Sequence, residues 1–312
     1  MTVNDAITTS GSTAATRDEP VYGIAPPAYR LPAATRLGRV RLQVSDLERS
    51  IAYYEGVLGL RPLHRTSERA TLAAQGEDTP LVELVERAGA RPVPRQGRLG
   101  LYHFAILLPQ RAALGRFIAH LAASGLYAGM SDHLVSEAVY LSDPDGLGIE
   151  VYADRPRESW RAAGRQLEMA TLPLDARAVV EAAEGEPWTG MPPGTVIGHV
   201  HLHVGSIEGA AAFYHAGLGL DKVVWSYPGA LFLSAGGYHH HLGTNTWARG
   251  AAPATDDDAR LLDWELVLPT AGDVTAAARS IESAGYAVER RDGDALAAAR
   301  DPWGTALRLR SA

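Results

Sequence analysis

The sequence contains no cysteine among its 312 residues. Disulfide bonds, thiolate metal sites and a cysteine nucleophile are therefore excluded, and any metal ion must be held by histidine or carboxylate side chains. No apolar run approaches the roughly 18 residues of a membrane span, and the first thirty residues lack the basic start and apolar centre of a signal peptide. We therefore expect a cytoplasmic protein that has no membrane partner.

Basic residues are in the minority. The 29 Lys and Arg residues against 36 Asp and Glu give a formal net charge of -7, and no basic stripe is present. Without such a stripe to displace counterions, a nucleic-acid partner is not expected, and a small-molecule ligand is favoured. The length and a hydrophobic content of 46% suffice for about two globular domains with a core each. The eleven histidines are the natural candidates for metal chemistry.

An internal repeat organises the chain. Val44-Ser45-Asp46-Leu47 recurs as Val204-Gly205-Ser206-Ile207, and Leu58-Gly59-Leu60 recurs as Leu218-Gly219-Leu220, in both cases 160 residues later. Such self-similarity indicates a duplication. The predicted organisation is an N-terminal tail and docking segment at 1–35, a domain at 36–154, a linker at 155–194 and a second domain at 195–312. The proline-rich part of the docking segment, residues 26–32, is expected to pack on the first domain.

Each half of the chain divides again by its apolar pattern. In the first half, alternation predicts a strand at 38–44, helical spacing predicts a helix at 47–58 capped by Asp46, and further strands are expected near 71–72 and 81–85. The second quarter repeats the order, with a strand at 102–108, a helix at 111–124 and strands at 138–142 and 149–152. The predicted fold class is α+β, with four tandem βαβββ modules, two in each half of the chain and numbered one to four in chain order.

These modules resemble the vicinal oxygen chelate superfamily, which includes glyoxalases, bleomycin resistance proteins and extradiol dioxygenases. The resemblance rests on Val-x-Asp-Leu, Leu-Gly-Leu and Asp-Pro-x-Gly-x-x-x-Glu elements and covers about residues 36–310. The runs at 100–109 and 236–243 resemble the four-module bacterial catechol 2,3-dioxygenases. The resemblance implies two domains whose curved mixed sheets enclose a metal cavity, with ligands on the first and last strands of paired modules.

The ligand positions of the superfamily fall on His103, Glu150 and His199, from modules two and three. Two histidines and one carboxylate form the facial triad of a non-haem Fe(II) site, which leaves open positions for substrate and oxygen. Mn²⁺ accepts the same ligands. We therefore expect the cavity to be shared between the end of one repeat and the start of the next.

The same positions in modules one and four carry a different set of residues: Arg39, Asp263 and Arg308. Two guanidinium groups and one carboxylate cannot hold a divalent cation. This set is interpreted as a structural ion-pair cluster or as the remnant of a second site after duplication.

Several further residues are candidates for chemistry around the metal. Tyr140, ten residues before Glu150, matches the family's tyrosine near the substrate hydroxyl, and His133 lies near the position of a second catalytic histidine. Because side chains alternate along a strand, His201 and His203 share a face with His199, so they are expected to line the cavity and bind substrate.

The run His239-His240-His241 is expected on the last strand of module three. Alternation then turns His239 and His241 towards the cavity, with His239 as the acid and base towards catechol and O₂. His241 would support the site or act as an alternate ligand, and His240 would contact substrate. A shift of one residue in register would transfer the acid and base role to His240.

The function that this resemblance implies is an Fe(II)-dependent extradiol dioxygenase that opens a catechol-type ring with O₂. The partners would be a small aromatic diol and O₂, and the resemblance favours a homo-oligomer. A glyoxalase-like isomerase on the same scaffold remains an alternative, for which a carboxylate-rich ligand set is expected. A metal-free ligand-binding or resistance protein is the second alternative.

Overall fold

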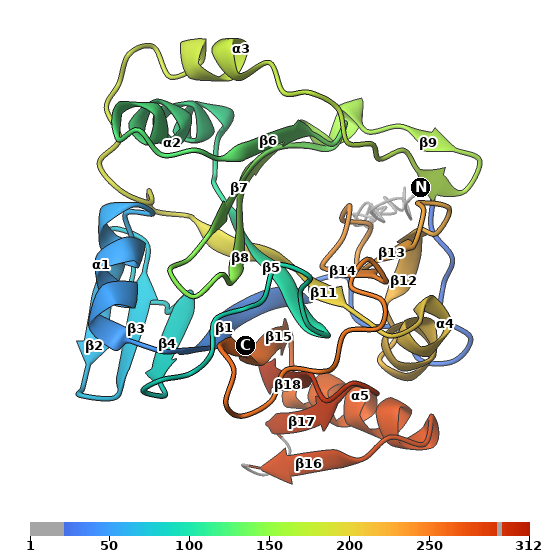
Figure 1. Cartoon of the computed structure of the whole chain (residues 1–312). Helices are drawn as coiled ribbons and strands as arrows, with labels where there is room; N and C mark the ends of the chain where they lie inside the picture. The colour runs from blue at the N-terminus through green and yellow to red at the C-terminus, as the bar shows by residue number, and fades with distance from the viewer. Residues whose placement is uncertain (1–21, 292–294) are drawn as a thin grey trace, which may run out of the picture.

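Two eight-stranded sheets carry the fold of this computed structural model, which describes residues 22–291 and 295–312 (Figure 1). The tail expected over residues 1 to about 20 lies outside the described residues. The sheet that contains the histidine run at 199–203 is called the histidine sheet, and its strand order is β12-β13-β14-β11-β5-β8-β7-β6. Its strands are β5 (Gly100–Leu107), β6 (Gly129–Asp132), β7 (Ser136–Ser142), β8 (Gly148–Asp154), β11 (Val196–His203), β12 (Asp221–Val224), β13 (Ala230–Ser234) and β14 (Leu242–Asn245).

The other sheet, called the arginine sheet, repeats the same plan in the order β16-β17-β18-β15-β1-β4-β3-β2. Its strands are β1 (Arg36–Val44), β2 (Arg61–Arg65), β3 (Arg69–Ala73), β4 (Val82–Glu86), β15 (Arg260–Leu268), β16 (Val288–Arg291), β17 (Leu296–Arg300) and β18 (Ala306–Ser311). In each sheet the two central strands are antiparallel, and each is parallel to its outer neighbour. The histidine sheet joins modules two and three, and the arginine sheet joins modules one and four, as the sequence predicts.

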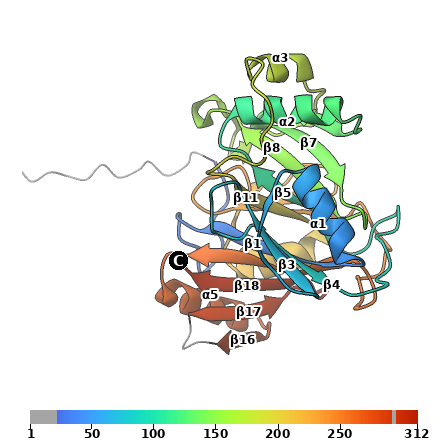
Figure 2. The same ribbon diagram turned by 90° about the vertical axis from the view of Figure 1, so that its left-hand side faces the viewer.

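Helices cover the outer faces of the sheets. The helices are α1 (Leu47–Gly56), α2 (Arg111–Ala123), α3 (Ala176–Glu181), α4 (Ile207–Ala210), which continues into the π-helical turn η2 (Ala211–Gly217), and α5 (Ala271–Ser283). Figure 2 shows α2 and α3 layered at one end of the molecule and α5 with β16–β18 at the other. No helix in the described part of the chain combines the length and apolar character needed to cross a bilayer.

Local signals in the sequence set the limits of these helices. The Asp46 side chain accepts a hydrogen bond from the Arg49 amide and so caps α1, as expected. Thr270 and Asp273 form a reciprocal capping box at the start of α5. Caps of this kind stabilise a helix by about 1 kcal/mol each.

Alternation along β1 and β11 explains how the core and the cavity are separated. Val200, Leu202 and Val204 are completely buried in the apolar core, as are Val40 and Leu42 of β1. The opposite face of β11 is therefore free to present its histidines. The predicted α+β fold of four modules with curved sheets is confirmed.

The docking segment packs on a different part of the molecule from the one expected. Arg30 forms a bidentate ion pair with Asp221 of β12, and the Leu31 amide donates to the Gly219 carbonyl. Leu31 is buried. The expectation that this segment packs on the first domain is wrong, because the residues that pair with Arg30 and Leu31 belong to module three.

The linker between the repeats contains several short elements of regular secondary structure. It contains the 3₁₀ turn η1 (Arg157–Ser159), the two short strands β9 (Ala162–Ala163) and β10 (Gln166–Leu167), and α3. The backbone of Asp132 on β6 exchanges hydrogen bonds with Leu172, which holds this stretch against the histidine sheet. The linker therefore contributes side chains to the cavity described below.

Candidate metal centre and surrounding cavity

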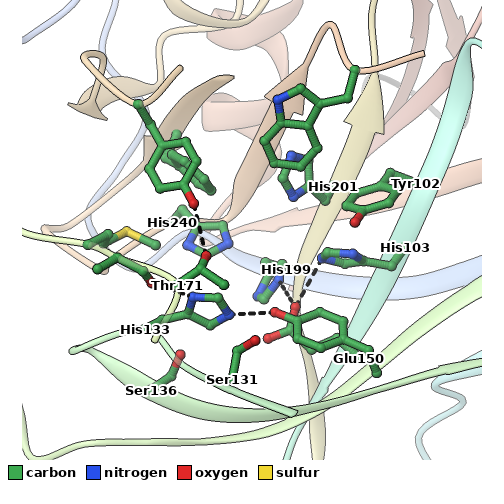
Figure 3. A pocket seen from close by; sticks show the side chains of 16 residues that line it. Tyr102, His103, Ser131, His133, Ser136, Glu150, Thr171, His199, His201 and His240 are labelled. Carbon is green, nitrogen blue, oxygen red and sulfur yellow. Dashed lines mark hydrogen bonds and ion pairs between the residues drawn. The ribbon is translucent and has the colours of Figure 1, made fainter. Parts of the chain in front are cut away.

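Two histidines and one glutamate converge on the central strands of the histidine sheet. In the strand register Ala105 of β5 lies opposite His199 of β11 on one side and Glu150 of β8 on the other. His103 stands two residues from Ala105 on the same strand. Glu150 Oε2 lies 3.0 Å from His103 Nε2 and 3.1 Å from His199 Nε2 (Figure 3). One ligand atom from each of the three residues falls within 4.8 Å of the others.

The electrostatics of these groups fit a divalent cation. Burial lowers the pKa of His199 to about 4, so this imidazole is neutral at neutral pH and offers a nitrogen lone pair. Burial would raise the pKa of Glu150, but the adjacent His199 and His103 hold it well below its usual range. The Nδ1 atoms of both His103 and His199 are buried without a hydrogen-bond partner. Two imidazoles and an ionised carboxylate with converging donor atoms suit Fe²⁺ or Mn²⁺.

Two irregularities in the pairing of β5 and β11 shape this site. Register shifts leave Gly198 as an extra residue on β11 and Tyr102 as an extra residue on β5. The bulge at Tyr102 allows two consecutive side chains, Tyr102 and His103, to line the same cavity. At Gly198 a side chain has no room, because a Cβ there would lie 1.8 Å from the Tyr152 hydroxyl oxygen.

Tyr140 and His133 form a hydrogen-bonded pair beside the three converging side chains. His133 Nδ1 lies 2.7 Å from the Ala170 carbonyl oxygen and must donate to it, so Nε2 of the neutral imidazole accepts the Tyr140 hydroxyl proton over 2.6 Å. Tyr140 also lies directly opposite Glu150 in the pairing of β7 with β8. Burial, reinforced by the charge of Glu150, raises the pKa of Tyr140 well above 10. Tyr140 therefore keeps its proton at neutral pH and can donate it.

The run His239-His240-His241 is not on a strand, which corrects the sequence prediction. Strand β13 ends at Ser234 and β14 begins only at Leu242, so the three histidines lie in the intervening loop. The two positive-φ glycines Gly236 and Gly237 turn the backbone there. Alternation does not apply in such a loop, and the side chain that lines the cavity is His240.

The neighbours of His240 point away from the cavity. His239 Nε2 lies 2.9 Å from Asp154 Oδ1, and His241 Nδ1 accepts from the Ala235 amide over 3.2 Å. Neither residue lines the inner cavity, which is enclosed by the histidine sheet and the linker. The expectation that His239 and His241 face the cavity together is therefore wrong.

His201 and His203 are held by a shared amide. Asn245 Nδ2 donates to His201 Nε2 over 3.0 Å, and His203 Nδ1 donates to Asn245 Oδ1 over 2.7 Å. His201 lines the inner cavity next to His103, whereas His203 lines an outer cavity that opens beside it. Of the two expected substrate-contacting histidines, only His201 faces the three converging side chains.

The inner cavity has a volume of about 210 Å³ and is walled by aromatic rings and by the linker. Its wall includes several residues that sequence reasoning did not find: Tyr102, Ser131, Ser136, Met169, Thr171, Tyr227, Phe232 and Trp247. An outer cavity of about 1460 Å³ adjoins it and shares Tyr102, His103, Tyr140 and Trp247. No periodic pattern in the sequence marks these wall residues, because most lie in loops or at a bulge.

The equivalent positions of the arginine sheet form ion pairs. Asp263 lies 2.6 Å from Arg41 and 3.0 Å from Arg308, while Arg39 lies 3.2 Å from both Glu83 and Glu265. Of the predicted cluster, Asp263 and Arg308 are paired directly. Arg39 is connected to them only through Glu83 and Arg41, which lie 3.2 Å apart, so the cluster is larger than expected. The guanidinium groups of Arg41 and Arg308 supply the positive charge that Asp263 would otherwise need from a cation.

Comparisons with known proteins agree with this architecture. The model of the Glyoxalase/Bleomycin resistance protein/Dioxygenase superfamily matches residues 36–151 and 196–309. A catechol-2,3-dioxygenase of Bacillus subtilis (strain 168) is 44% identical over 262 residues, which are 83% of this chain and 91% of the relative.

Solved structures share the fold at low sequence identity. A putative dioxygenase from Bacillus subtilis subsp. subtilis str. 168 superimposes with a TM-score of 0.61 at 16% identity, over 91% of this chain and 86% of that one. Glyoxalase I from Zea mays gives a TM-score of 0.52 at 17% identity, over 89% of this chain and 92% of that one. The resemblance inferred from the repeat is confirmed, and the chain belongs to the Glyoxalase/Bleomycin resistance protein/Dioxygenase superfamily.

Proposed function

We propose that this protein is an Fe(II)-dependent extradiol dioxygenase that opens a catechol-type ring with O₂. The observation that carries the proposal is the convergence of His103, His199 and Glu150 on one point at the wall of an aromatic-lined cavity. The similarity to a catechol-2,3-dioxygenase over most of the chain supports the same reaction class. Mn²⁺ is the other metal that this ligand set accommodates.

His103, His199 and Glu150 would hold the metal through two imidazole nitrogens and one carboxylate oxygen. When bound, Fe(II) supplies redox chemistry towards O₂ and Lewis acidity towards two adjacent ring hydroxyls. The protein residues position the substrate and manage its protons. The carboxylate and the two neutral imidazoles leave one positive charge of a divalent cation uncompensated, which favours a substrate that binds as an anion.

The remaining cavity residues supply proton donors and acceptors at suitable places. His240 faces the cavity and would accept a hydroxyl proton from the catechol. The high pKa of Tyr140 keeps its hydroxyl protonated. Because that one proton is shared with His133 Nε2, the hydroxyl oxygen would accept a hydrogen bond from a hydroxyl group of the substrate. His133 orients that hydroxyl through the 2.6 Å contact.

The size and lining of the inner cavity favour a small ring. Its volume of about 210 Å³ is below the roughly 300 Å³ at which pockets for drug-sized ligands begin. Tyr102, Phe232 and Trp247 can pack against an aromatic substrate through edge and face contacts. We therefore propose a single-ring catechol, any substituent of which extends into the outer cavity.

The alternatives of the sequence analysis are less well supported. A glyoxalase-like isomerase was expected to have a carboxylate-rich ligand set, but among the described residues the cluster contains a single carboxylate. A metal-free binding protein would not need three buried groups that aim their donor atoms at one point. A homo-oligomeric state and a cytoplasmic location stay predictions.

Anaerobic purification followed by metal analysis and assay tests the proposal. The wild-type protein should contain about one iron per chain and should convert catechol with O₂ into a yellow ring-opened semialdehyde. Glu150→Ala should lose both iron and product formation. Arg308→Ala is the matched control, because Arg308 occupies the place of Glu150 in the arginine sheet, and it should retain iron.

Two results would contradict the proposal. If the reconstituted wild-type protein binds iron but forms no ring-opened product from any of a panel of single-ring catechols, the reaction is wrong. If Glu150→Ala and Arg308→Ala lose iron to the same extent, the three converging side chains are not the metal site.

A further inference from the structure

A chain of hydrogen bonds runs behind His240, away from the cavity. Asp154 Oδ1 lies 2.9 Å from His239 Nε2, and His239 Nδ1 lies 2.7 Å from His240 Nδ1. His239 is completely buried, whereas the side chain of Asp154 retains 27% of its exposure. The chain therefore links a residue at the surface with the histidine that faces the candidate metal centre.

The donor and acceptor capacity of each group determines where the protons of this chain lie. A carboxylate only accepts, so His239 Nε2 must carry a proton and donate it to Asp154. When both imidazoles are neutral, His239 Nδ1 has no proton and must accept from His240 Nδ1. Neutral His240 is thereby left without a proton on Nε2. The arrangement selects the tautomer in which the outer nitrogen of His240 is an acceptor.

Strand β8 and side chains of the linker hold this chain of hydrogen bonds in place. Glu150, Tyr152 and Asp154 alternate along β8, so the same strand face supplies both a candidate metal ligand and the carboxylate that starts the chain. The loop that carries the histidines is fastened by Arg157, which donates to the Gly236 carbonyl over 2.8 Å. Trp160 packs edge-on against His239 with ring centroids 5.3 Å apart.

We propose that Asp154 and His239 are positioning residues that hold His240 as the tautomer with a free Nε2 towards the cavity. This inference rests on the proposed function, in which His240 accepts a proton from the substrate. In that step the substrate O–H bond breaks and an N–H bond forms at Nε2 of His240. The proton on Nδ1 of His240 then moves to Nδ1 of His239, where the adjacent carboxylate of Asp154 stabilises the positive charge.

Asp154→Asn tests the proposal with little change of shape. The amide of asparagine can donate to His239 Nε2, which would reverse every hydrogen bond in the chain and leave His240 with a proton on Nε2. We expect kcat to fall roughly 10²- to 10⁴-fold, the range for loss of a general base or of its correct tautomer, with KM and iron content unchanged. Asp154→Glu, which keeps the carboxylate, should recover part of kcat.

Tyr238→Phe is the matched control. The Tyr238 hydroxyl also donates to Asp154 Oδ1, over 3.2 Å, so this change removes a hydrogen bond to the same atom without touching His239. It should leave kcat close to the wild-type value. An equal loss of kcat in Asp154→Asn and Tyr238→Phe would indicate a merely structural role for Asp154 and overturn the proposal.

Nitrogen-15 NMR of the histidine rings reads the tautomers without turnover. In zinc-loaded wild-type protein, His240 should show its unprotonated nitrogen at Nε2, and in Asp154→Asn at Nδ1. A proton on Nε2 of His240 in the wild type overturns the proposal, even if Asp154→Asn fails to fold. If the iron enzyme forms no ring-opened product while the tautomers are as expected, the proposed function is wrong and the hydrogen-bonded chain stands.

Discussion

Replacing Gly198 by alanine would place a methyl group where the Tyr152 hydroxyl lies. A Cβ at this position comes within 1.8 Å of the hydroxyl oxygen, 2.7 Å of Cζ and 3.0 Å of Leu107 Cβ. Non-bonded carbon atoms pack about 3.5 to 4.0 Å apart, so either β11 or the tyrosine ring must move. Overpacking of a core costs about 1 to 3 kcal/mol, and a clash this close should cost about 3 kcal/mol.

A double-mutant cycle isolates the cause. Tyr152→Phe removes the nearest atom and alone should cost about 1 kcal/mol, for the lost hydrogen bond of 2.7 Å to Tyr238. Because Cζ remains within 2.7 Å of the added methyl group, relief is partial. We expect the Gly198→Ala/Tyr152→Phe protein to be about 1 kcal/mol more stable than additivity implies.

Urea unfolding of the metal-free proteins, with linear extrapolation of the free energy of unfolding, measures the four corners of this cycle. Gly56→Ala in α1 is the matched control, since a Cβ there meets nothing within 4 Å. It should stabilise the protein by about 0.5 kcal/mol. Additivity within about 0.3 kcal/mol for the Gly198 and Tyr152 changes would refute the steric argument.

Two further predictions concern the ion pairs and a buried histidine. Asp263→Ala leaves Arg41 and Arg308 partly buried without their shared carboxylate. In urea unfolding this change should lower the free energy of unfolding by about 2 to 3 kcal/mol, less than for a fully buried pair, and the iron content should not change. A loss below about 0.5 kcal/mol would contradict this prediction. Burial lowers the pKa of His241 to about 3 from 6.5, so the unfolded chain binds a proton first as the pH falls. As the pH falls from 6.5 to about 3, this histidine should therefore reduce the free energy of unfolding by about 1.4 kcal/mol per pH unit. In His241→Asn that slope should be smaller by the same amount, and an unchanged slope would show that His241 is not the cause.

The repeat and the alternation of apolar residues predict most of the fold, because both depend on spacing alone. The order of strand, helix and strands in each module follows from period-two and helical patterns, and the cap at Asp46 marks the start of α1. The offset between copies also identifies Arg308 as the residue that corresponds to Glu150 in the second repeat. These features can be predicted because each regular element of a module follows a single period.

The sequence predicts the site less completely, for physical reasons that differ between residues. Tyr102 faces the cavity only because a β-bulge breaks the alternation of β5, and no residue pattern marks that bulge. The sequence predicts that His239 to His241 form the last strand of module three, but glycines with positive φ at 236 and 237 make the segment a loop. Asp154 acts through His239, so its place follows only from tertiary contacts.

The two sheets show two ways in which a curved sheet can keep a polar inner face. In the arginine sheet Asp263 corresponds to His103 and Arg308 corresponds to Glu150. Their opposite charges pair over 3.0 Å, so the pair needs no bound ion. In the histidine sheet the buried Glu150 carboxylate has imidazoles, rather than guanidinium groups, as its partners, with His103 Nε2 at 3.0 Å and His199 Nε2 at 3.1 Å. A buried carboxylate without a full positive charge beside it is costly. A bound cation removes that cost and, by mass action, stabilises the folded state. Metal binding should therefore raise the stability of the histidine sheet, while the arginine sheet needs no ligand to be stable.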